Sequence, residues 1–85
     1  MYSNNAKDDP RVVRTERMLK NAFMSLLEEK DYDQITVTDI ASTAGYNRAT
    51  FYNHFKYKDE LVEDLVREKM EAFSNAFLYP FLRKN

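Results

Sequence analysis

The sequence of 85 residues contains no cysteine, one glycine, two prolines and one histidine. Without cysteine, neither a disulfide framework nor a thiolate metal site can form, so nothing points to an oxidising compartment. Long apolar runs are also missing, because the longest have three to four residues and a membrane span needs about 18. We therefore expect one small domain with no membrane segment and no metal site.

The first ten residues, MYSNNAKDDP, are polar and lack the apolar region of a secretory signal. The expected compartment is therefore the cytoplasm. Residues 1–10 are also expected to form a flexible arm, because polar side chains dominate there and Pro10 disfavours helix at Asp9.

Few side chains are suited to catalysis. A nucleophile–base pair would need His54 with a hydroxyl group, and a metal site would rest on His54 with carboxylates such as Asp59. No metal-binding spacing such as H-x-x-E-H is present. The sequence therefore predicts a protein that is not an enzyme and that uses no cofactor.

Charge is balanced overall but unevenly distributed. Thirteen Lys and Arg stand against 14 Asp and Glu, for a net charge of −1. Between Ile40 and Lys58, however, no acidic residue occurs, and this window also holds Arg48 and Lys56. A basic face on a neutral domain can meet phosphates. Chance is the alternative explanation for an acid-free window of this length.

An apolar stripe predicts a first helix at about residues 11–30. Its members recur at the spacing of one helix face: Leu19, Ala22, Phe23, Leu26 and Leu27. Basic residues lie near the start of this helix and two glutamates at its end, an order that is unfavourable to the helix dipole. An anionic partner near the start and plain surface variation would each explain this order.

Two short helices are predicted on either side of the only glycine. Thr36, followed three residues later by Asp39, has the pattern of a helix N-cap, and Gly45 suits the left-handed residue that ends a helix. Asn47 can cap the next helix, which extends to about Phe55. Two helices joined by a short turn within about twenty residues have the spacing of a helix-turn-helix.

A fourth helix is expected from near Lys58 to Pro80, with acidic residues in its first turn. Its apolar stripe continues to the end of the chain: Leu61, Leu65, Val66, Met70, Phe73 and Phe77. The predicted fold class is therefore all-α, a small helical bundle with a helix-turn-helix: three homeodomain-like helices plus the start of a fourth. A three-helix core cannot cover the apolar residues beyond Phe73, so we expect these to pair with a second copy or to fray.

The second helix of such a motif enters the major groove, and its neighbours contact phosphates. Arg48 can bind guanine or a phosphate, Asn47 and Asn53 can bind adenine, and Thr50 offers a hydroxyl and a methyl group. Ala49 is small enough to let the helix approach closely. Four further residues are natural phosphate partners: Tyr46, Tyr52, His54 and Lys58.

Each of these residues also has a purely structural interpretation. Asn47 and Thr36 are needed as caps whatever else they do. Tyr52 fits a half-buried surface position, whereas Phe51 and Phe55 fit the core. Ordinary solvated side chains would account for three others: Arg48, Lys58 and His54.

A resemblance to a known family lies in residues 35–61, ITVTDIASTAGYNRATFYNHFKYKDEL. This stretch resembles the DNA-binding signature of the TetR (tetracycline-repressor-like) family of bacterial transcription regulators. From Thr50 onward it is similar to the family's run of an aliphatic or aromatic residue, Tyr, any residue, His or Tyr, Phe, then Lys, any residue, Lys. The resemblance covers about residues 11–75, because the family's opening helix fits Arg14 to Lys30.

The resemblance implies sequence-specific binding to a double-stranded DNA operator by a transcription regulator, with repression as the expected action. It places Thr36 and Thr38 against phosphates, Tyr52 and His54 at backbone-contacting positions, and Lys58 at a phosphate. The base-facing start of the recognition helix falls on Asn47, Arg48, Ala49 and Thr50. Two departures from the family pattern stand out. Tyr46 and Asn47 replace small residues, which bears on the base contacts, and Tyr57 replaces a polar cap, which predicts a weaker start of the fourth helix.

The resemblance also implies a larger helical domain, outside this chain, that binds a small-molecule inducer and forms a homodimer. Residues 11–57 would be the DNA-binding domain, and residues 58–85 a fourth helix and apolar tail leading to that further domain. No inducer site of about 300 Å³ or more is expected inside so small a core. The alternative function is a protein-interaction module that docks through the apolar fourth helix.

Overall fold

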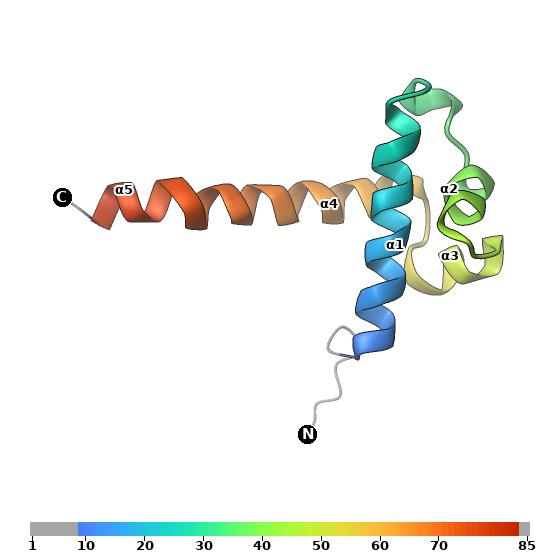
Figure 1. The fold of residues 1–85 in the computed structure, drawn as a ribbon, viewed down its shortest axis with the longest axis horizontal. Coiled ribbons are helices and arrows are strands. Elements are labelled where there is room, and N and C mark those ends of the chain that lie inside the picture. The colour runs from blue at the N-terminus through green and yellow to red at the C-terminus, as the bar shows by residue number, and fades with distance from the viewer. Residues whose placement is uncertain (1–8, 84–85) are drawn as a thin grey trace.

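The structure is a computed structural model that describes residues 9–83, and these residues form helices joined by short turns (Figure 1). The main helices are α1 (Pro10–Leu27), α2 (Val37–Ala44), α3 (Arg48–His54) and α4 (Lys58–Phe73). A 3-10 helix, η2 (Tyr32–Gln34), joins α1 to α2, and α4 continues through a π-helical segment, η3 (Ser74–Leu78), into α5 (Tyr79–Arg83). The described residues contain no strand, so the all-α prediction is confirmed.

The start of α1 differs from the expected one. The Asp9 carboxylate accepts a hydrogen bond from the backbone N–H of Arg11 at 2.9 Å, and Pro10 takes the first helical position, where its missing N–H costs nothing. Asp9 and Pro10 therefore belong to the helix start and not to an arm. The rest of the expected arm, residues 1–8, lies outside the described residues.

The helix-turn-helix has the expected caps. The Thr36 hydroxyl accepts from the Asp39 backbone at 3.0 Å, and the Asp39 carboxylate accepts from the Thr36 backbone at 3.1 Å, so both sides of a capping box are present. Gly45 ends α2 in the left-handed region with φ 88°. Asn47 then caps α3 by accepting from the Thr50 backbone at 2.9 Å. Local chemistry therefore determines both ends of the turn between α2 and α3.

One apolar core holds the first three helices and the start of α4 together. Its buried members come from each of the four helices, from the loop before α2 and from the residue that follows α3: Leu19, Ala22, Phe23, Leu26, Ile35, Ile40, Ala41, Phe51, Phe55, Leu61 and Leu65. Phe51 is fully buried and Phe55 is 5% exposed, as predicted. Burying apolar area of this kind is the dominant favourable contribution to folding. The core thus fixes α3 against α1 and α2.

Beyond this core, α4, η3 and α5 form one long rod on the opposite side of α1 from α2 and α3 (Figure 1). The expected helix end at Pro80 is wrong, because the helix continues to Arg83. Proline clashes with the carbonyl four residues earlier, and that carbonyl, of Ala76, lies in the widened π turn of η3. The Tyr79 N–H bonds to the Ser74 carbonyl five residues back, so the chain absorbs the proline without a break.

The start of α4 has no side-chain cap from Tyr57, as the departure from the family pattern predicted. No described helix has both the length and the apolar character needed to cross a membrane.

Candidate nucleic-acid interface

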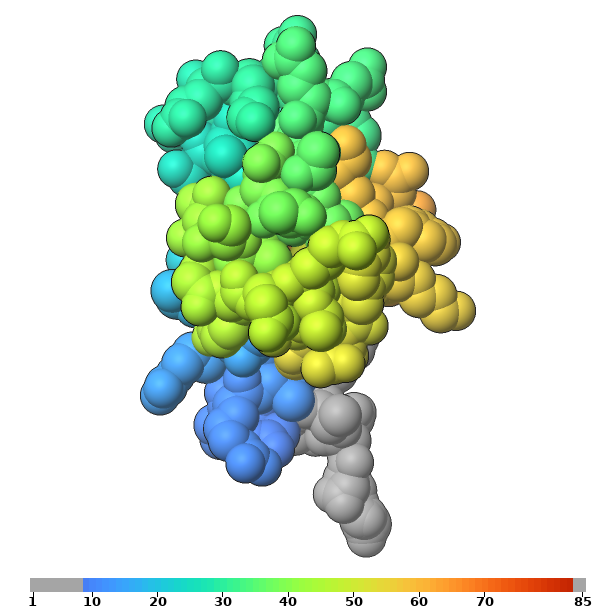
Figure 2. All heavy atoms as spheres, turned by 90° about the vertical axis from the view of Figure 1, so that its right-hand side faces the viewer, coloured from blue at the N-terminus to red at the C-terminus, as the bar shows by residue number. Residues whose placement is uncertain are grey.

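Figure 2 shows the face of the molecule formed by α2 and α3, which pack side by side. Most of the predicted contact residues are exposed on these helices or at their starts: Thr36, Thr38, Asn47, Arg48, Ala49, Tyr52 and Asn53. The remaining four are partly buried: Tyr46, Thr50, His54 and Lys58. The fold therefore leaves most of the predicted residues exposed and presents the start of α3 to solvent.

Arg48 and Tyr52 form a pair one helical turn apart on α3. The guanidinium carbon of Arg48 lies 5.2 Å from the centroid of the Tyr52 ring, within the range of a cation–π contact. Tyr52 is itself held edge-on against the buried Phe51 ring, with centroids 5.5 Å apart. The aromatic ring thus restrains an exposed guanidinium at the start of α3, where it can reach a guanine edge or a phosphate.

Because Asn47 caps α3, it can make fewer hydrogen bonds to a base. Its side-chain oxygen accepts from both the backbone N–H and the hydroxyl of Thr50, at 2.9 and 3.0 Å. A bidentate contact to adenine needs the amide oxygen and the amide nitrogen together, so Asn47 can offer a base only its nitrogen while it caps α3. Asn53 is exposed in the last turn of α3, and no such cap involves it.

Lys58 binds the protein's own backbone. Its ammonium donates to the carbonyls of Tyr32 and Ile35, both at 2.8 Å, and lies 4.0 Å from the centroid of the Tyr32 ring. The Tyr32 hydroxyl in turn donates to the Asp59 carboxylate. Lys58 therefore fastens the start of α4 to η2, a role that sequence reasoning missed. An ammonium has three N–H donors, so a phosphate contact would rest on the remaining one.

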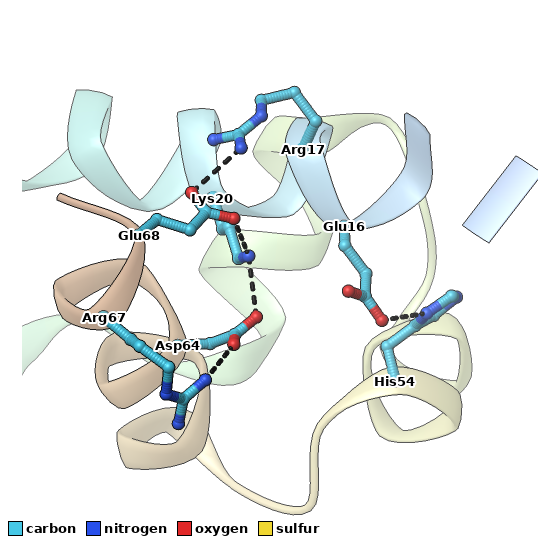
Figure 3. A network of polar contacts seen from close by, with 7 residues as sticks. All are labelled: Glu16, Arg17, Lys20, His54, Asp64, Arg67 and Glu68. Atoms are coloured by element: carbon cyan, nitrogen blue, oxygen red, sulfur yellow. Dashed lines mark hydrogen bonds and ion pairs between the residues drawn. The ribbon is translucent and has the colours of Figure 1, made fainter. Parts of the chain in front are cut away.

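His54, the last residue of α3, pairs with α1. Its Nδ1 lies 3.1 Å from a carboxylate oxygen of Glu16, and both side chains are less than one fifth exposed (Figure 3). The two residues line a surface hollow of about 220 Å³ together with Glu60, Asp64 and Arg67 from α4. The carboxyl end of the proposed recognition helix is thus tied to α1.

An ionic cluster between α1 and α4 was not predicted either. Lys20 is only 3% exposed, and its ammonium lies 2.7 Å from an Asp64 oxygen and 2.6 Å from a Glu68 oxygen. Arg17 also binds Glu68, at 2.9 Å, and Arg67 binds Asp64, at 2.6 Å (Figure 3). The anionic partner that the basic start of α1 suggested is therefore, for Arg17 and Lys20, the acidic face of α4. In the sequence, only the opposite charges of these two helices could have indicated the contact.

Hydrogen bonds within the cluster favour the charged forms of Lys20 and Glu68. Burial opposes the charge on Lys20, but the hydrogen bonds that its ammonium donates to Asp64 and Glu68 outweigh burial and raise the pKa of Lys20 above its usual value. Burial likewise opposes ionisation of Glu68, and hydrogen bonds from Lys20 and Arg17 outweigh it, so the pKa of Glu68 lies below its usual value. This cluster joins two helices and lies outside the α2–α3 face.

Comparison with known proteins gives a family match at residues 21–65, to bacterial regulatory proteins of the tetR family. An uncharacterised HTH-type transcriptional regulator of Bacillus subtilis, YxbF, is 45% identical over 60 residues, which are 69% of this chain and 16% of that protein. The dhaKLM operon transcriptional activator DhaS of Lactococcus lactis is 42% identical over 59% of this chain and 27% of its own length. The transcriptional regulator EthR of Mycolicibacterium smegmatis is 38% identical over 60% of this chain and 25% of its own length.

This chain therefore spans about a quarter or less of the length of these relatives. No solved structure matches it significantly. The family match covers just over half of the chain and contains α2, the turn and α3. The chain belongs to the tetR family of bacterial transcription regulators and carries the family's DNA-binding helix-turn-helix.

Proposed function

We propose that α3 enters the major groove of an operator and that residues 36–58 supply the contacts. The observation that carries this proposal is the segregation of charge in the fold. The acid-free window from Ile40 to Lys58 contains all of α3 and most of α2, whereas acidic residues crowd α4. An approaching phosphate backbone would meet Arg48 without repulsion from neighbouring carboxylates on the same helix.

Within this interface, we assign base readout to the first and last turns of α3. Arg48 reads guanine or anchors a phosphate, and Asn53 is better placed than Asn47 to form a bidentate contact with adenine. Ala49 and the Thr50 methyl group allow close approach. Phosphate contacts then come from the surrounding residues: Thr36, Thr38, Tyr46, Tyr52, His54 and Lys58.

For the whole protein, we propose a cytoplasmic homodimer whose further domain binds an inducer. Two recognition helices about 34 Å apart would then engage successive half-sites on one face of the duplex. Repression is the action that needs only occupancy of a promoter, although the L. lactis relative is named an activator. Transcript levels with and without the full-length protein would decide between the two.

Titration of a duplex at several salt concentrations tests the proposal. If about six phosphates are contacted, the log–log salt slope should be near −5. Docking of a protein through the apolar fourth helix would give no such dependence, and a slope near zero would contradict DNA binding. Selection of bound sequences from a random DNA pool would then identify the operator.

Arg48→Ala should weaken operator binding by about 1–3 kcal/mol and relax the preference at one or two base positions. Arg83→Ala is the matched control, because it removes the same exposed side chain from α5, on the opposite side of α1. If both variants bind as the unchanged chain does, Arg48 plays no part in readout.

A further inference from the structure

We propose that Glu16 is a positioning residue for DNA binding: it holds His54 so that a backbone phosphate is contacted only by the doubly protonated imidazole, and binding therefore takes up a proton. This inference rests on the proposed function, because it needs α3 on DNA. It adds a residue of α1 to the interface and a pH dependence that the helix-turn-helix alone does not imply.

His54 and Glu16 form a pair in which only one ring nitrogen faces the carboxylate. The Nδ1 atom of His54 faces Glu16, and the second ring nitrogen, Nε2, points away from that carboxylate (Figure 3). His54 is the last residue of α3, the helix whose first turn carries Arg48. The imidazole is 14% exposed, so one part of it still reaches solvent while the other is held against α1.

The chemistry of imidazole then limits what His54 can do. A carboxylate only accepts hydrogen bonds, so Nδ1 must carry a proton to bind Glu16. In a neutral ring Nε2 then has a lone pair, which a phosphate oxygen repels. Only the imidazolium donates from both nitrogens and can bridge Glu16 and a phosphate. Glu16 thus selects the tautomer that excludes neutral His54 from the DNA contact.

Charged groups of α1 and α4 surround His54. Besides Glu16, the hollow beside the ring is lined by Glu60 and Asp64 and by one cation, Arg67. Asp64 is occupied by ion pairs with Arg67 and Lys20, and a carboxylate oxygen of Glu60 accepts from the Lys56 backbone at 2.7 Å. Glu16 is therefore the group that determines the orientation of the ring.

Linkage gives the size of the effect. If the complex holds one proton more than the separate molecules, affinity must rise as pH falls, by up to about tenfold per pH unit. The range is about pH 5 to 8, where histidine is the side chain that ordinarily changes charge. Because the chain has a single histidine, no other imidazole contributes.

The experiment measures the affinity of the full chain for a mixed-sequence duplex of about 20 bp, two helical turns, across that pH range at constant ionic strength. The unchanged chain should bind more tightly as pH falls. Glu16→Gln should flatten the profile and raise affinity at the alkaline end, because an amide can donate to Nδ1 as well as accept from it. His54→Gln should be flat as well.

Glu63→Gln is the matched control, since it removes the same charge from an exposed residue that does not line the hollow. It should keep the pH dependence of the unchanged chain. In parallel, ¹⁵N NMR of the one histidine at about pH 8, the upper end of the range in which histidine ordinarily changes charge, should show a proton on Nδ1 in the unchanged chain and a shift toward Nε2 in Glu16→Gln. Circular dichroism verifies that each variant is folded.

Three results would overturn the inference. Salt-dependent binding with no pH dependence would contradict the role of Glu16 and His54 and leave the proposed function intact. A profile that Glu16→Gln does not flatten would show that Glu16 does not position His54. Absence of duplex binding at every pH and salt concentration would contradict both this inference and the proposed function.

Discussion

The two halves of the long carboxy-terminal helix have similar apolar spacing and different surroundings. In the first half, Leu61 and Leu65 are at most 5% exposed because α1 and the core cover them. In the second half, Phe73, Phe77 and Phe81 are 56–66% exposed. Apolar periodicity therefore predicts a helix in both halves, but it does not tell which element covers the stripe.

The boundary between the halves coincides with a surface hollow of about 400 Å³ between α1 and α4. Its lining is almost entirely apolar and includes Phe23, Leu27, Val62, Val66 and Met70. An apolar surface thus runs from the bundle onto the rod. The space lies at the surface and not inside the core, so it differs from the enclosed inducer site that is not expected inside so small a core.

The sharpest way to test this comparison is one substitution made in both regions. Phe51→Ala should cost about 3–5 kcal/mol of the free energy of unfolding, because it removes a fully buried ring from the core. Phe77→Ala should change it by about 0.5 kcal/mol or less, as an exposed side chain does. Urea denaturation followed by circular dichroism measures both, and equal costs would refute the contrast.

The next largest effect on the free energy of unfolding should come from the ionic cluster that joins α4 to α1. Lys20→Ala should cost about 2 kcal/mol, because it leaves two carboxylates without their buried cation and opens a cavity. Lys20→Met, which keeps most of the volume, should cost less. If Lys20→Met is as damaging as Lys20→Ala, the charge and not the packing carries the contribution.

The same cluster predicts a pH dependence. The pKa of Glu68 is lowered in the folded chain, so its contribution is present above the usual glutamate pKa of about 4.3 and lost as pH falls through the folded value. The pKa of Lys20 is raised, so its contribution is present below about 10.4 and lost as pH rises through the folded value. The stability difference between the unchanged chain and Lys20→Met should therefore be constant between these limits and shrink outside them.

Some features of the fold could be predicted from the sequence, and others could not. The caps at Thr36, Gly45 and Asn47 depend on residues three or four positions away, so local spacing was sufficient. The bond from Lys58 to η2 and the pair of Glu16 with His54 join distant segments, and no local pattern encodes them. For the same reason, the sequence predicted that the start of α3 is exposed but did not predict that His54, its last residue, pairs with Glu16.

Pro80 shows the opposite failure. A local rule placed the helix end there, and the π turn of η3 absorbs the ring instead. The DNA contacts assigned to individual residues remain predictions, because they depend on the duplex. The fold class and the helix caps are confirmed by the structure.

Gly45→Ala should have a smaller effect, of about 1–2 kcal/mol. A Cβ at this position would meet nothing within 4 Å, so the cost comes from the left-handed backbone alone. Gly45→Asn should cost less, because asparagine tolerates this conformation better. Thermal unfolding of the two variants gives the comparison, and a neutral Gly45→Ala would mean that the turn relaxes.

The smallest effect on stability and the largest on assembly should come from the exposed half of the rod. Replacing Phe73 and Phe77 by serine should leave unfolding nearly unchanged and reduce self-association, because it breaks up an exposed apolar surface. Light scattering over a concentration series measures this. A chain that is monomeric at every concentration before the substitution would contradict pairing through the rod.

The central claim is that the α2–α3 face, and not the rod, binds DNA. Amide signals of the ¹⁵N-labelled chain, recorded while a duplex of about 20 bp is added at low salt, test it most directly. The signals of residues 36–54 should shift, and those of residues 66–83 should not. Shifts confined to the rod, with α3 unaffected, would contradict the claim.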